Sequence, residues 1–123
     1  MGKVAPDAMI DAALAYVQAC DKEFVCSAEP SSYSDAATAV DLATTAMTPT
    51  TDFPIANGAS GRKCTPAAKP GVTIDHSGTA THIALGLTAG ATLRYVTTCT
   101  GQALTVGGTV DIPAWIIQIA DPT

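Results

Sequence analysis

The stretch VTIDHSGTATHIALGL, residues 72–87, is the part of the sequence that decides the fold class. Apolar side chains alternate with polar or small ones in 72–76 and again in 82–87. A period of two residues is typical of a β-strand with one buried face. Residues 77–80, SGTA, include a glycine that can adopt a positive φ. The stretch therefore predicts two antiparallel strands joined by a tight turn.

The only two histidines, His76 and His82, flank this expected turn. If both alternations hold, the two rings project to opposite faces of the sheet. A zinc site needs three or four convergent ligands. We therefore expect a half-buried His76, an exposed His82 and no metal ion between them. A shift of the register by one residue would overturn this assignment.

Similar short apolar segments recur along the chain at roughly ten-residue spacing, which is typical of sandwiches and barrels. The further expected strands are EFVCSA (23–28), DFPI (52–55), RKCTPA (62–67, an edge strand or strand end), TLRYVTTC (92–99), a hairpin over 104–112 with its turn at Gly107–Gly108, and WIIQIA (115–120). Alternation in 92–99 puts Leu93 and Tyr95 on one face. The single tryptophan, Trp115, is expected to fill the core.

The segment before the first strand has helical periodicity, and we expect a helix over about residues 6–19. Pro6 suits the first helical position. The apolar face at i, i+3, i+4 and i+7 consists of Ile10, Ala13, Leu14 and Val17. Met9 and Tyr16 flank this face. We expect the helix to cover the sheet, and the alternative is a helix that packs on a partner subunit.

These elements predict a mainly β protein: an antiparallel β-sandwich or barrel of about seven or eight short strands with one N-terminal α-helix. We expect residues 1–123 to form a single domain, with the sandwich over 52–120. An irregular segment over about 29–50 contains either a loop with a short helical turn or a weak edge strand around 39–46.

Composition excludes several classes of function. The chain has 123 residues and a net charge of −5, with only six Lys and Arg. Binding of nucleic acid or of an anionic membrane needs a basic surface, so neither partner is expected. No stretch approaches the roughly 18 consecutive apolar residues of a membrane span. We expect the protein to be made in a cytoplasm.

The sequence shows no motif of a known catalytic chemistry. The G-x-S-x-G, P-loop and H-E-x-x-H patterns are absent. The closest acidic pair, Asp21 and Glu23, is interpreted as part of a solvated connection. The four cysteines contain no C-x-x-C pair, so zinc-knuckle spacing is absent. We expect no catalytic residues, no cofactor and no metal; the enzyme alternative is a cysteine- or metal-dependent one, such as a Cys–His pair.

Four stretches resemble small virion-associated proteins of tailed bacteriophages. They are VCSAEPSSYSDA (25–36), SGRKCTPAA (60–68), SGTATHIAL (77–85) and LRYVTTCTGQALTVGGTVDIPAW (93–115). The resemblance implies a structural virion protein, a capsid decoration or cement protein on the outer head surface. Its implied partners are the major capsid protein lattice and itself, as a homotrimer. The alternative is a neck, tail or fibre component or a host-adhesion module of the particle.

Two sets of residues follow as candidate contacts. Met9 and Tyr16 on the helix, and Tyr33 in the irregular segment, are predicted to carry lattice contacts. Cys20 and Cys64 depart from the pattern of the resemblance, and we predict that they form disulfides between subunits after lysis exposes the particle to oxidising conditions. The alternative is that these cysteines are buried free thiols that pack as small hydrophobic residues.

Overall fold

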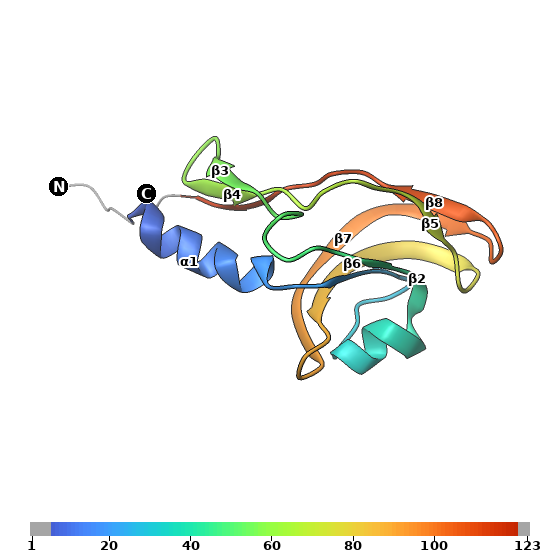
Figure 1. Cartoon of the computed structure of the whole chain (residues 1–123). Coiled ribbons are helices and arrows are strands. Elements are labelled where there is room, and N and C mark those ends of the chain that lie inside the picture. The colour runs from blue at the N-terminus through green and yellow to red at the C-terminus, as the bar shows by residue number, and fades with distance from the viewer. Residues whose placement is uncertain (1–5, 121–123) are drawn as a thin grey trace.

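The computed structural model describes residues 6–120 and is mainly β, with 46% strand and 17% helix (Figure 1). The predicted fold class is confirmed: the sheets are antiparallel, one helix lies at the N-terminal end, and the barrel is not closed. The elements in chain order are α1 (Asp7–Gln18), β1 (Lys22–Cys26), the π-helical turn η1 (Asp35–Ala39), β2 (Asp41–Ala46), β3 (Ile55–Asn57), β4 (Arg62–Cys64), β5 (Lys69–Thr73), β6 (Gly78–Leu87), β7 (Thr92–Leu104), β8 (Thr109–Ile112) and β9 (Ile117–Ile119).

The strands form one large sheet and two small ones. The large sheet has the order β2-β1-β6-β7, and the small ones are β3-β4-β9 and β5-β8. A single bridge between Ala43 and Ile74 connects β2 to the residues that follow β5. Figure 1 shows β6 and β7 as a long curved hairpin, with β5 and β8 lying across from it. Strands therefore enclose a core on several sides, and the enclosure is incomplete between β7 and β8.

The predicted hairpin within 72–87 is wrong, although β5 and β6 both contribute residues to this stretch. β5 pairs with β8, whereas β6 pairs with β1 and β7. The expected turn residues 78–80 are the first residues of β6, which pair with β7. The actual turn before β7 includes Gly90 with φ 77° and Ala91 with φ 48°. Alternation correctly predicts burial of Val72, Ile74, Ile83 and Leu85, but it does not predict the strand partner.

The turn predicted at Gly107–Gly108 exists, but it does not close a hairpin. Gly107 has φ 90°, and the Gly108 N–H donates to the Thr105 carbonyl at 3.1 Å. The strands on either side, β7 and β8, belong to different sheets. This turn therefore carries the chain from one wall of the core to the opposite wall.

Helix α1 packs on the core much as predicted. Ile10, Leu14 and Val17 are buried, together with Phe53 of the loop before β3 and Leu85 of β6. Ala13, which was expected on the buried face, is exposed. The buried face is narrower than the sequence pattern indicated.

Both faces of the large sheet are covered, which the alternation did not predict. Ile83 and Leu85 are buried as expected, but Ala84 and Gly86, expected toward solvent, are buried as well. The cover is formed by η1 and the neighbouring Tyr33 and Val40, and β2 follows η1 within the segment 29–50. Both alternatives for this segment are therefore realised, and β2 is an edge strand of the large sheet.

A β-bulge at Arg94 corrects the predicted face assignment in β7. Leu85 pairs with Tyr95 and Gly86 pairs with Leu93, so Arg94 is an extra residue on β7. Leu93 consequently packs with the outer cluster and Tyr95 with the inner one. A bulge changes the face to which the following side chains point, and the spacing of apolar residues alone did not indicate it.

Candidate functional site

The outward surface of α1 is apolar, although it faces solvent. Met9 is 60% exposed and Tyr16 is 50% exposed. The exposed side chains on this surface are Ala8, Met9, Ala12, Ala13, Ala15 and Tyr16. A helix that covers a core normally carries charged and polar residues on its outer side. We call these six residues the α1 surface; it is the apolar surface that a contact with another protein needs.

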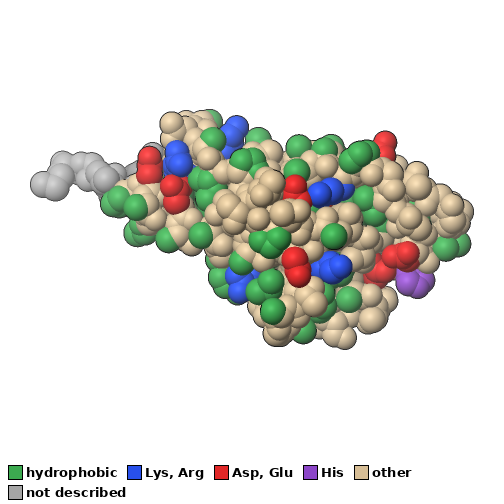
Figure 2. Space-filling model, in the orientation of Figure 1, with side chains coloured by type: hydrophobic (Ala, Val, Ile, Leu, Met, Phe, Trp, Pro, Cys, Tyr) green, Lys and Arg blue, Asp and Glu red, His purple; other side chains and the backbone are tan. Residues whose placement is uncertain are grey.

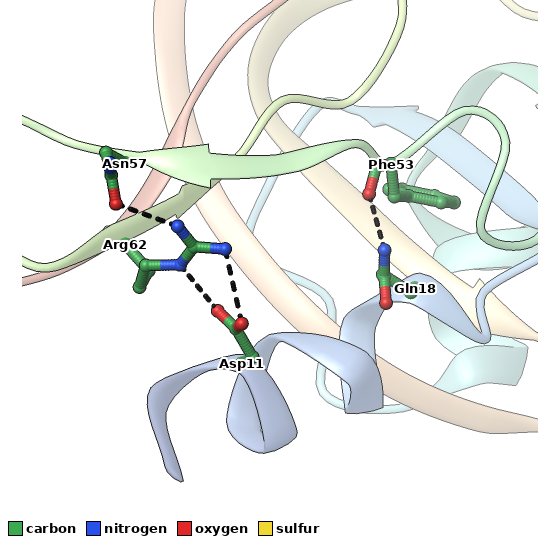
Figure 3. A network of polar contacts seen from close by, with 5 residues as sticks. All are labelled: Asp11, Gln18, Phe53, Asn57 and Arg62. Atoms are coloured by element: carbon green, nitrogen blue, oxygen red, sulfur yellow. Dashed lines mark hydrogen bonds and ion pairs between the residues drawn. The ribbon is translucent and has the colours of Figure 1, made fainter. Parts of the chain in front are cut away.

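Polar contacts hold α1 rigidly in place (Figure 3). The Arg62 guanidinium of β4 donates to both carboxylate oxygens of Asp11, at 2.8 and 3.2 Å, and to the Asn57 side chain at 2.8 Å. Gln18 donates to the Phe53 carbonyl at 2.7 Å. Two polar side chains of the helix, Asp11 and Gln18, are thus used on its inner flank and not on the α1 surface.

Tyr16 is held from the other side by β7. The Arg94 guanidinium lies 4.0 Å from the centroid of the Tyr16 ring, and it donates to the Tyr16 carbonyl at 2.7 Å. A cation over an aromatic face fixes the ring in one orientation. Tyr16 is therefore a pre-positioned exposed aromatic side chain, of the kind that dominates protein contacts.

Tyr33, the third predicted lattice contact, packs against other residues of the same chain. Its ring packs edge-to-face on Phe24 with 5.4 Å between centroids, and its hydroxyl lies 3.3 Å from the Thr88 hydroxyl. A Cβ on Gly86 would come within 2.8 Å of the Tyr33 ring. Most of the ring therefore covers the sheet, and Tyr33 offers less surface to a partner than Met9 or Tyr16.

Cys20 and Cys64 are both fully buried and belong to the same hydrophobic cluster. Burial raises the pKa of each thiol to about 11. This placement fits the alternative of packed free thiols. A disulfide to another subunit stays a prediction, and it would require this cluster to open.

The two histidines lie in environments opposite to the expected ones. The His76 side chain is 62% exposed, with Nδ1 3.6 Å from an Asp41 carboxylate oxygen. His82 is half-buried, and its Nδ1 lies 2.9 Å from the Thr81 hydroxyl. Between residues 6 and 120, no group of three or more His, Cys, Asp or Glu side chains is placed to hold a metal ion.

A cleft of about 430 Å³ opens between β7 and β8. Its floor is apolar and includes Val25 of β1 and Ile83 of β6, which also belong to a buried core cluster. The two walls come from the facing strands and from the segment after β8. The lining residues are Val25, Ala80, Ile83, Thr97, Thr98, Cys99, Thr100, Gln102, Leu104, Val110, Asp111, Ile112, Pro113, Trp115 and Ile116. We call this the β7–β8 cleft.

Glu23 is fully buried beside this cleft, contrary to the expectation of a solvated connection. The Trp115 indole N–H donates to one of its carboxylate oxygens at 2.9 Å, and the other oxygen has no hydrogen-bond partner among residues 6–120. Burial raises the pKa of Glu23 to about 6, against the lowering effect of the Trp115 hydrogen bond and the Lys69 charge. The predicted core role of Trp115 is realised in part: its ring stacks on Tyr95 and contacts two core clusters, and it also lines the cleft.

The sequence carried only a weak signal for this pair. Glu23 directly precedes the apolar run FVC (24–26) of β1, and a charge next to such a run is a candidate for burial with a partner. The partner, Trp115, is 92 residues away, so only the fold brings the two together.

Charged side chains on the viewed face occur singly or in small groups of mixed sign (Figure 2). Over the described part of the chain, no helix is long and apolar enough to cross a membrane. Comparison with protein-family models, with curated proteins and with solved structures found no match.

Proposed function

We propose that the protein is a structural component of a phage particle, a capsid decoration or cement protein that binds the outer head surface and stabilises contacts between capsomers. The observation that carries the proposal is the α1 surface, which exposes Met9 and Tyr16 on a rigid helix. The resemblance of four stretches to small virion-associated proteins supplies the biological context. A neck, tail or fibre component would also use such a surface, so location on the particle is the point to test.

The shape of the surface supports an architectural role. Specific protein contacts bury about 800 Å² per partner and depend on a few aromatic or apolar anchors. Tyr16 and Met9 supply two anchors about two helical turns apart, and the alanines between them allow a partner to approach the helix closely. Repeated copies on a lattice add avidity to a modest single contact. The number of copies that associate with one another is a separate question, for which the resemblance implies three.

The test is binding to purified particles that lack this protein. We expect the wild-type chain to co-sediment with the particles and the double variant Met9→Glu/Tyr16→Glu to remain in the supernatant, because both apolar anchors are lost and two carboxylates are placed in an apolar contact. Val106→Glu is the matched control, since Val106 is 55% exposed. It lies in the β7–β8 turn, at the other end of the molecule from α1 (Figure 1).

Binding of the double variant at the wild-type level would remove α1 from the interface. Failure of the wild-type chain to bind any particle preparation would contradict the decoration role itself. Circular dichroism of both variants establishes that a loss of binding does not reflect a loss of folding.

A further inference from the structure

The β7–β8 cleft has the two features that bind an extended polypeptide: free strand edges and an apolar floor. β7 is the last strand of the large sheet, and β8 is the last strand of the β5–β8 pair. Each strand therefore has one edge without a strand partner among residues 6–120. Both strands contribute lining residues to the cleft. An added strand obtains main-chain hydrogen bonds from such an edge and specificity from pockets that take alternate side chains.

A second bulge lies in the part of β7 that borders the cleft. His82 pairs with Thr98 and Ala80 pairs with Gln102, so the three residues 99–101 of β7 face the single residue Thr81 of β6. Bulges of this kind interrupt the ladder and re-aim side chains, and they are over-represented beside functional sites. Cys99 and Thr100 of this bulge line the cleft.

The charges of the residues that line the cleft indicate which kind of extended segment would bind there. Among residues 6–120, Asp111 is the only charged residue in the lining of the cleft, and it is exposed. One of its carboxylate oxygens accepts the Gly71 N–H at 2.8 Å, which leaves the other available. The remaining lining is apolar or carries hydroxyl, thiol or amide groups. The cleft therefore suits an uncharged extended segment with a single Lys or Arg near Asp111.

We propose that the β7–β8 cleft binds an extended segment of the capsid subunit as an added strand along β7, with apolar side chains over Val25 and Ile83 and a basic side chain at Asp111. This inference rests on the proposed function and adds a second contact to the α1 surface. The added strand fills the gap between β7 and β8, so binding to the lattice and completion of the fold occur together.

The reactivity of Cys99 can be used to measure binding of a segment in the cleft. Cys20, Cys26 and Cys64 are each 0% exposed, whereas Cys99 is partly exposed and lines the cleft. A maleimide reagent therefore labels Cys99 selectively in the folded protein, slowly because burial raises the pKa of its thiol. We expect labelling of Cys99 to slow about tenfold or more when the protein is bound to particles, because the added strand covers the thiol.

Two controls make this result specific. The Met9→Glu/Tyr16→Glu variant, mixed with the same particles, should label at the rate of the free protein if it remains unbound. Asp111→Asn keeps an acceptor for the Gly71 N–H but removes the charge, and we expect it to weaken particle binding several-fold. Asp75→Asn, at an exposed acidic residue outside the cleft, should bind as the wild type does.

The outcomes separate the two proposals. Binding to particles with Cys99 still labelled at the free rate would overturn the cleft inference and leave the decoration role standing. Absence of any particle binding would overturn both. Protection of Cys99 that rises with protein concentration in the absence of particles would identify a second copy as the occupant, and would also overturn the inference as stated.

Discussion

The two faces of strand β1 are covered in different ways. On the outer face, Phe24 is 1% exposed and Cys26 is 0% exposed, beneath the Tyr33 ring and Ala36 of η1. On the inner face, Glu23 lies under Trp115, and Val25 forms part of the floor of an open cleft.

The outer face of β1 therefore contributes mainly to stability, whereas the inner face is the one expected to bind a partner. The outer face is a fully apolar contact, and such contacts stabilise a domain in proportion to the area that they bury. The inner face retains a carboxyl group with one unpaired oxygen and an opening to solvent, both of which cost stability. Natural sequences depart from consistent packing mainly at functional or strained sites, so the inner face is where a partner is expected.

The largest loss of stability is expected when the largest side chain of the outer face, Phe24, is removed. Phe24→Ala should reduce the free energy of unfolding by about 3–5 kcal/mol, because it deletes a buried ring and leaves a cavity. Ile116→Ala, at the mouth of the cleft where Ile116 is 54% exposed, should change it by less than about 0.5 kcal/mol. Urea unfolding followed by circular dichroism measures both. Equal losses would show that the two faces contribute alike.

A smaller effect is expected at the buried carboxyl group on the inner face. Burial raises the pKa of Glu23 from 4.5 to about 6, so the stability that its protonated form provides is complete below pH 4.5 and is lost as the pH rises through 6. A shift of about 1.5 units corresponds to about 2 kcal/mol. Glu23→Gln remains neutral and keeps an acceptor for Trp115, so it should be more stable than the wild type by about this amount at pH 7.5.

The measurement is urea unfolding of both proteins at pH 4.5 and pH 7.5. The two proteins should have similar stability at the lower pH, where Glu23 is largely protonated. A constant difference at both pH values would mean that the carboxyl group does not titrate within this window. A wild type more stable than the variant at pH 7.5 would contradict the assigned direction of the pKa shift.

The smallest effect on stability is expected on the α1 surface. Met9→Glu and Tyr16→Glu should each change the free energy of unfolding by about 0.5 kcal/mol or less, because exposed side chains contribute little to folding. Tyr16→Glu also loses the contact with Arg94, so it should be the more destabilising of the two. Thermal unfolding followed by circular dichroism measures both. A loss comparable to that of Phe24→Ala would mean that α1 depends on these residues for folding, not for recognition.

The sequence predicted the elements of this fold better than their partners. Local periodicity was sufficient for α1 and for most strands, because helix and strand periods differ and end at turn residues. It was insufficient for 72–87, where β5 and β6 are consecutive but belong to different sheets. It also missed the bulge at Arg94, because a bulge depends on the pairing of two strands and not on one segment.

The candidate site was predictable only in part. Met9 and Tyr16 were identifiable because they lie beside the apolar face of a helix, and both are exposed. The burial of Glu23 left only a weak signal in the sequence, a charge beside an apolar run, and the cleft left none. Both depend on Trp115 and β8 meeting β1 and β7 across the core, which is a matter of long-range packing.

The number of copies of this protein per particle distinguishes a decoration protein from a neck, tail or fibre component. Quantitative mass spectrometry of purified virions gives the molar ratio to the major capsid protein. A decoration or cement protein should be present in hundreds of copies, near parity with the capsid subunit. A dozen copies or fewer would place the protein at the neck, tail or fibre, and its absence from the particle would contradict a structural role.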